Sequence, residues 1–348
     1  MIDYSQAKIT SIALHKVGNR HREEGNFISK ELAQLTPQAE ELLMQYFLRP
    51  FLKATDVYQF GSIDELGANV VFNSAQAIFD DINSVLPESI NLLMHLHEQS
   101  NHPHIKIGEV FVVHFSTMAF DNEVVDAVGI FKAETKNPFF KFIEQTDILE
   151  LVDHLGVSAN KLDKGCLIFN TQRELGFRVL TVDANNYDSE YWKLNFLNIE
   201  RCNDNHFQTR SHVEMVKEFS RDILAPNNRT EQIAFVNESM EYMNDKEEWD
   251  NDDFGVTVLR NADLQHAFND YRQQYSERTG VALEDSFDIS VPELQSQKKK
   301  YRNQINLDTH IQIKLPFSPD GQQANIERGY DEVKGMFYYK VFFMKEFE

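Results

Sequence analysis

The chain has 348 residues, of which 34 are Lys or Arg and 55 are Asp or Glu, so its formal net charge at pH 7 is −21. This length favours about two domains. The composition, with 42% hydrophobic and 26% charged residues, excludes wholesale disorder and a collagen-like chain. No stretch approaches the roughly 18 consecutive apolar residues of a membrane span, and the first ten residues lack the pattern of a secretory signal. Because only Cys166 and Cys202 are present, a disulfide framework is excluded and we expect a cytoplasmic protein.

The acidity extends along the whole chain. Residues 1–200 contain 16 basic and 28 acidic residues, and residues 201–348 contain 18 and 27. The negative electrostatic field of such a chain repels polyanions at long range. The screening length in physiological salt is only about 8 Å, so a local basic patch can still contact phosphate.

The first half of the chain predicts helices mixed with antiparallel strands. The segment Lys8–Val17 has strand character, and Thr36 followed by Pro37 is typical of a capped helix start. A helical region interrupted near Pro87 follows. The remaining predicted strands of this half are Ile107–Phe115, Val124–Lys132, Cys166–Asn170 and Phe177–Asp183.

The second half predicts helices followed by strands. Apolar residues recur at helical spacing in three segments, and the period changes to two at Ile311–Leu315. The aromatic C-terminal strand, MFYYKVFFMKEF, is apolar on both faces, which favours burial between core layers; a face for a partner or a dimer is the alternative. We therefore expect an α+β fold, with an N-terminal α+β domain at 1–187 and a mainly helical domain closed by antiparallel strands at 188–348. The three helical segments are His206–Leu224, the stretch after Asn228 to Met243, and Leu264–Tyr275.

Motifs for nucleotide phosphates and for a nucleophilic serine are missing from the sequence. The four histidines at 95, 97, 102 and 104 suggest a metal site, but their spacing favours a polar helix end and loop. The acidic run beginning at Asp250 has Phe254 and Asn261 where a calcium loop needs ligands, which favours a solvated loop. The sequence thus predicts no cofactor, no metal site and no catalytic residue.

One enzyme-like pattern provides an alternative. Glu134 and Lys136 follow an apolar run, and Asp126 lies upstream. Magnesium-dependent nucleases use an Asp and a Glu to hold the metal and a Lys to stabilise the developing charge. This pattern offers a nuclease hypothesis, against which a charged strand exit is the simpler interpretation.

The strongest basic patch consists of Lys298, Lys299, Lys300, Tyr301 and Arg302. No acidic residue occurs between Leu294 and Leu307. Lysines and arginine bind phosphate, and a tyrosine ring offers a stacking surface. These five residues are the candidate DNA-binding residues.

Four parts of the sequence form a pattern that extends along most of the chain: Ile12–Val17, the helix after Thr36, the strand pair after Gly108 and, above all, the block YWKLNFLNIERCNDNHFQTRSHVEMVKEF at Tyr191–Phe219. In these segments the chain resembles the bacterial 37-kilodalton nucleoid-associated (NdpA-like) protein family. In that family a short strand, here Phe196–Asn198, leads through a turn into a long amphipathic helix. The resemblance implies a cytoplasmic protein located at the bacterial nucleoid, with DNA binding and no established enzymatic activity.

The expected function is therefore a non-enzymatic, nucleoid-associated one. The partners are DNA, contacted through the 298–302 patch or indirectly, and chromosome-associated proteins; a homodimer is possible and no membrane is involved. The net charge favours the indirect route at physiological salt. A magnesium-dependent nuclease and a scaffold that binds only proteins are the alternatives.

Overall fold

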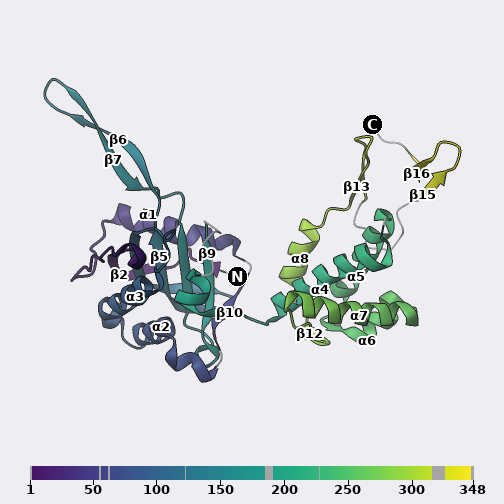
Figure 1. Ribbon diagram of the computed structural model, residues 1–348, viewed down its shortest axis with the longest axis horizontal. Helices are drawn as coiled ribbons and strands as arrows, with labels where there is room; N and C mark the ends of the chain where they lie inside the picture. The colour runs from purple at the N-terminus through teal and green to yellow at the C-terminus, as the bar shows by residue number, and fades with distance from the viewer. Residues whose placement is uncertain are drawn as a thin grey trace. The chain divides into compact units, whose positions relative to one another are not determined.

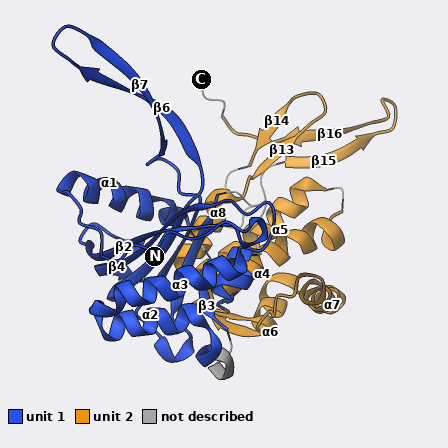
Figure 2. Cartoon of the chain, turned by 60° about the vertical axis from the view of Figure 1, so that its left-hand side comes forward, with its two compact units in different colours: residues 1–202 blue, residues 203–348 orange. Residues whose placement is uncertain are grey.

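The computed structural model describes residues 2–54, 56–61, 63–121, 123–184, 191–226, 228–315 and 326–345. The chain forms two compact units, residues 1–202 and residues 203–348, shown in two colours in Figure 2. The domain boundary expected at residue 187 lies outside the described residues.

The first unit is built on an antiparallel sheet that has eight strands within the described residues. Its order is β1-β4-β5-β8-β9-β3-β10, and β2 pairs with β4 beside β1. The strands are β1 (Ile2–Asp3), β2 (Lys8–Val17), β3 (Tyr58–Phe60), β4 (Gly108–Phe120), β5 (Glu123–Ala133), β8 (Lys164–Phe169), β9 (Arg178–Asp183) and β10 (Ile199–Arg201).

Helices cover both faces of this sheet, because successive strand residues point to opposite sides. Ile130 of β5 joins the core under α2 and α3, whereas the next residue, Phe131, stacks on Phe47 of α1 with ring centroids 4.1 Å apart. The helices are η1 (Arg20–Arg22), α1 (Pro37–Leu48), η2 (Arg49–Lys53), η3 (Ile63–Ala68), α2 (Val70–Asp80), η4 (Ile82–Ser84), α3 (Val85–Gln99), η5 (Arg173–Leu175) and the π-helix η6 (Tyr191–Leu197).

Local signals positioned the longer strands of the sheet and the α-helices correctly. The strand predicted at Lys8–Val17 and the helix capped by Thr36 are confirmed. The helical region breaks at 81–84, and Pro87 lies in the first turn of α3, where a missing N–H costs nothing. The strand expected at Phe196–Asn198 is wrong in position, because η6 extends to Leu197 and β10 begins at Ile199.

A long two-stranded ribbon leaves the first unit between β5 and β8. Strands β6 (Lys136–Glu144) and β7 (Leu149–Val157) pair from Lys136 opposite Val157 to Glu144 opposite Leu149. Figure 1 shows this ribbon extending beyond the sheet and helices of its unit. We call residues 136–157 the arm. It was not among the elements predicted from the sequence.

The second unit is mainly helical. Its core packs residues of α4, α5 and α7 around Trp249 and Phe254, both fully buried. Gly280 ends α7 in the left-handed conformation that glycine favours. Its elements are α4 (Asn205–Phe219), the π-helix η7 (Ser220–Leu224), α5 (Arg229–Asp245), β11 (Glu248–Asp250), α6 (Asn251–Phe254), the π-helix η8 (Gly255–Leu259), α7 (Ala262–Thr279), β12 (Ser286–Asp288), α8 (Val291–Lys300), β13 (Gln304–Asn306), β14 (Gln312–Lys314), β15 (Ile326–Asp331) and β16 (Met336–Val341).

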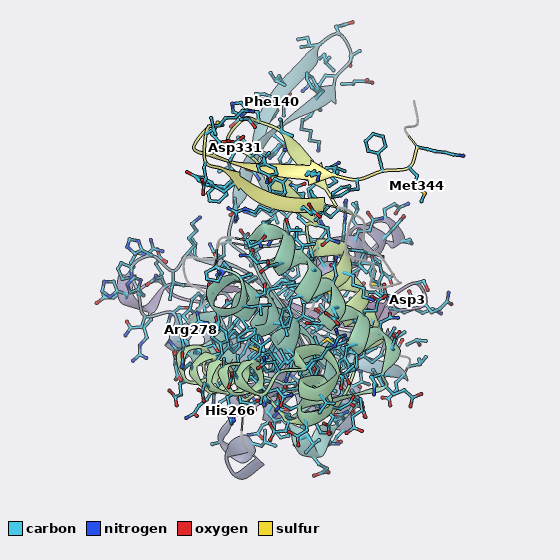
Figure 3. The ribbon with its side chains drawn as sticks, turned by 90° about the vertical axis from the view of Figure 1, so that its right-hand side faces the viewer. Asp3, Phe140, His266, Arg278, Asp331 and Met344 are labelled. Carbon is cyan, nitrogen blue, oxygen red and sulfur yellow. The ribbon has the colours of Figure 1, made fainter. Side chains whose placement is uncertain are left out.

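The C-terminal strands form two small antiparallel pairs, β13 with β14 and β15 with β16. Burial of the aromatic C-terminal strand between core layers is wrong for the described residues. Phe337 of β16 is 61% exposed, and Met344 in the following tail is fully exposed (Figure 3). Among the described strands, β16 pairs only with β15, and five of its six residues are exposed.

The fold class is α+β, as the sequence predicts. The first unit combines an antiparallel sheet with helices, and the helical second unit ends in antiparallel strands. No helix of the described residues combines the length and the apolar character of a membrane span.

Candidate nucleic-acid interface

The five candidate DNA-binding residues lie at the end of α8. The Ser290 hydroxyl caps this helix by accepting a hydrogen bond from the Glu293 N–H, and Pro292 occupies the first turn. The helix ends with three lysines in its last turn, where positive charge interacts favourably with the helix dipole.

Packing adds two cations to this helix end. Lys217 of α4 and Arg229 at the start of α5 each lie 5.5 Å from the centre of the Tyr301 ring. The Arg229 guanidinium also donates to the Arg302 carbonyl (3.1 Å). Sequence reasoning missed both cations, since they lie more than 70 residues away along the chain. The basic patch is therefore defined as Lys217, Arg229, Lys298, Lys299, Lys300 and Arg302 around Tyr301.

The cations of the basic patch are not equivalent. Lys299, Lys300 and Arg302 are exposed. Lys298 is half-buried; burial lowers the pKa of its ammonium, and the carboxylates of Glu241 and Asp245 on α5 oppose that effect. The positive charge of Lys298 is thus offset by two acids of its own unit.

The ring of Tyr301 is packed against its neighbours and does not offer an open face on which a base could stack. Its side chain is half-buried, and two cations lie near its ring. Burial lowers the pKa of the Lys217 ammonium, which donates to the Gln297 side chain (3.0 Å). Cation–π contacts of this kind contribute about 0.5–1 kcal/mol each at exposed sites, so the ring helps to gather the cations.

The three residues of the nuclease hypothesis do not come together. Asp126 lies within β5 near His114 (3.8 Å), and the Lys136 ammonium pairs with Glu109 (2.6 Å). Asp126 and Glu134 are separated by most of β5, roughly 27 Å at about 3.4 Å per residue. The side chain of Glu134 is only 4% exposed.

Glu134 instead belongs to a buried ion network at the root of the arm. Lys132 and Lys164 are opposite each other in neighbouring strands and are almost completely buried. The Lys132 ammonium pairs with Glu134 (2.8 Å), and it donates to the Lys106 carbonyl (2.7 Å) and the Tyr191 hydroxyl (3.1 Å). We name Lys132, Glu134, Asp163, Lys164, Asp183 and Tyr191 the buried ion network.

The same network fastens the two ends of the arm. The Asp163 carboxylate accepts hydrogen bonds from the Glu134 and Thr135 N–H groups (2.8 and 2.9 Å) and from the Thr135 hydroxyl (2.7 Å). Lys164, the next residue, pairs with Asp183 (2.7 Å). Burial lowers the pKa of the Lys132 ammonium, although Glu134 opposes this. The network holds the residues just before β6 against those just after β7.

The histidines between 95 and 104 point to different partners. His95 lies 3.0 Å from the Phe196 carbonyl, and His97 lies 3.0 Å from the Glu24 carbonyl.

The acidic run beginning at Asp250 starts a helix. The Asp250 carboxylate caps α6 by accepting a hydrogen bond from the Asp253 N–H. In the part of the chain that the structure describes, no group of three or more His, Cys, Asp or Glu side chains is placed to hold a metal ion.

The family of the chain follows from its comparison with known proteins. The family model described as nucleoid-associated protein YejK matches residues 13–332. The chain belongs to this nucleoid-associated protein family. The match spans both units, including the arm, the buried ion network and the basic patch. No curated protein matches the chain.

Proposed function

We propose that this nucleoid-associated protein acts at the chromosome without enzymatic activity, and that it contacts DNA phosphates locally through the basic patch. The observation that carries the proposal is the convergence of cations from α4, α5 and the end of α8 on Tyr301, in a unit rich in acidic residues. Family membership supports a location at the nucleoid, and hence in the cytoplasm.

A small patch suits so acidic a protein. With a net charge of −21, the chain as a whole repels DNA, and only groups within about 8 Å of a phosphate act on it strongly at physiological salt. The exposed Lys299, Lys300 and Arg302 are the direct contacts in this proposal. Tyr301 acts by holding neighbouring cations, and the charge of Lys298 is already offset by Glu241 and Asp245.

Replacing the three exposed cations should remove most of the salt-dependent DNA affinity. For the full chain and a duplex oligonucleotide, we expect log K to fall with log salt at a slope of about −3, which corresponds to the three direct phosphate contacts at about 0.9 each. The K299A/K300A/R302A variant should reduce this slope by about 2 to 3, since each lost contact removes about 0.9. Fluorescence anisotropy across a salt series measures both slopes.

Lys298→Ala is the matched control, because it removes one lysine of the same run whose charge is already compensated. It should change the slope by less than about one unit. Unchanged affinity of the triple variant would show that the basic patch is not the contact. The remaining route to the chromosome would then be a chromosome-associated protein.

We also propose that the chain has no nuclease activity. Supercoiled plasmid incubated with the full chain and Mg²⁺ should stay supercoiled, because Glu134 is buried against Lys132 and Asp126 lies far along β5. Agarose gel electrophoresis checks this. Nicking that Glu134→Ala abolishes and Lys136→Met weakens would contradict the proposal and favour the magnesium-dependent nuclease.

A further inference from the structure

The arm exposes an unusual amount of apolar surface. Every described side chain of β6 and β7 is exposed or half-buried, and the two strands pair only with each other. Phe140 on the arm is 68% exposed (Figure 3). An isolated two-stranded ribbon is at best marginally stable in water. Soluble monomers also rarely expose large contiguous apolar patches. A ribbon of this kind gains stability from a partner.

The apolar side chains are unequally divided between the two faces of the arm. In an antiparallel pair, residues opposite each other point to the same side, so the register assigns each residue to a face. One face is mostly apolar, and we call it the apolar face of the arm. It contains Pro138, Phe140, Phe142, Leu149, Leu151, Leu155 and Val157, together with Lys136, Glu144 and Asp153.

The opposite face is more polar, and some of its side chains contact one another within the arm. It contains Lys141, Glu150 and His154 among its residues. Its aromatic ring, Phe139, stacks on His154 with centroids 5.6 Å apart. The ring also covers Gly156, where an added Cβ would lie 2.8 Å from it. Among the described residues, no aromatic ring stacks on Phe140 or Phe142 of the apolar face.

The charge of the arm argues against DNA as its occupant. Residues 136–157 contain two lysines, at 136 and 141, and four acids, at 144, 147, 150 and 153. A net negative ribbon is repelled by phosphate, whether of nucleic acid or of an anionic lipid surface. The recognition chemistry of the apolar face is therefore burial against another apolar protein surface.

The exposed apolar area of the arm is suited to contact with a second copy of the same chain. The six large apolar side chains from Phe140 to Val157 are 36–71% exposed. At roughly 100 Å² each they offer about 600 Å² per copy, before backbone and rim residues are added, against about 800 Å² per partner in a stable interface. A two-fold pairing uses the same patch on both copies, so both apolar faces are covered at once.

We infer that two copies of the chain associate by packing the apolar faces of their arms against each other. The buried ion network fixes the root of each arm, so the ribbon is presented at a defined place on its unit. The dimer carries two basic patches, but the inference does not depend on DNA contact.

Cysteine cross-linking at adjacent positions tests which face is buried. The native Cys166 and Cys202 are buried, so an introduced cysteine is the reactive thiol. Leu151→Cys places a thiol on the apolar face, and Val152→Cys places one on the opposite face of the same strand. Under oxidation of the full chain, we expect at least fivefold more disulfide-linked dimer for Leu151→Cys. Equal cross-linking at both positions would overturn the inference.

Sedimentation velocity of the full chain tests the association itself. The wild-type chain should form dimers in the micromolar range, and F140S/F142S should weaken association by about 100-fold, as for two central interface residues. The control F337S/Y338S removes two exposed aromatics of β16 and should leave the dimer intact. A monomeric wild-type chain at 100 µM, or loss of the dimer only in the β16 variant, would overturn the inference. Circular dichroism of each variant shows that folding is retained.

Discussion

Mild acid should destabilise the second unit through one buried histidine. His212 of α4 is fully buried, and its Nδ1 lies 2.9 Å from the Gln208 carbonyl. Its ring packs 4.8 Å from Trp249 and 4.6 Å from Phe287. Burial lowers the pKa of His212 from 6.5 to about 3, so the folded chain keeps this imidazole neutral where the unfolded chain protonates it.

The direction of this effect and the pH range in which it acts follow from the difference between the folded and unfolded pKa of His212. The folded pKa lies below the unfolded one, so the contribution is fully present above pH 6.5 and is lost as the pH falls toward 3. Each pH unit in this window costs about 1.4 kcal/mol, which amounts to about 2–3 kcal/mol at pH 4.5. This is a large part of the 5–15 kcal/mol that typically stabilises a domain.

Urea unfolding of the full chain between pH 7 and 4.5 measures this loss. The chain has two tryptophans, one in each unit, so a Trp192→Phe background leaves Trp249 as the reporter of the second unit. His212→Phe should flatten the dependence on pH. The control His266→Phe changes an exposed histidine of the same unit (labelled in Figure 3) and should keep it. An equal slope in both variants would show that His212 is not the responsible group.

Breaking the buried ion network should cost the first unit about 3–5 kcal/mol of unfolding free energy. Lys132→Met leaves the Glu134 carboxylate buried without its principal cation, and an uncompensated buried charge carries a penalty of this size. The double variant K132M/E134L should be milder than Lys132→Met alone, because it removes both charges together. Urea unfolding reported by Trp192 in a Trp249→Phe background measures the difference.

The pair Lys136–Glu109 provides the matched control two residues beyond Glu134. Its ammonium and carboxylate are 2.6 Å apart, but the side chains are 43% and 24% exposed. Lys136→Met should therefore cost less than about 1 kcal/mol. If Lys132→Met costs no more than Lys136→Met, the buried ion network does not stabilise the root of the arm.

Most secondary structure was predictable because its signals are local. The strand character of Lys8–Val17 indicates β2, a hydroxyl cap followed by proline defines the start of α1, and the Asn228 side chain caps α5 by accepting from the Glu231 N–H. The α+β class follows from these elements. The arm escaped prediction, because its strands do not pack on a core and the adjacent Phe139 and Phe140 break the two-residue period of a half-buried strand.

The candidate sites were predictable only in part. The run from Lys298 to Arg302 is visible in the sequence, but its neighbours Lys217 and Arg229 become visible only when α4 and α5 pack beside α8. The pattern of Glu134 and Lys136 suggested a metal site. Strand register instead places Glu134 beside Lys132 in the interior and turns Lys136 to Glu109 at the surface.

The acidity, the α+β class and the position of the lysine run can be derived from the amino-acid sequence, because composition and residue spacing are properties of the chain alone. Which charges are buried, which cations gather and which apolar faces remain uncovered becomes visible only in the folded chain. Burial of a side chain depends on the residues that lie opposite it. Whether Lys132 meets Lys164, and whether the apolar face of the arm meets a core, depends on pairings between distant segments that no local pattern records.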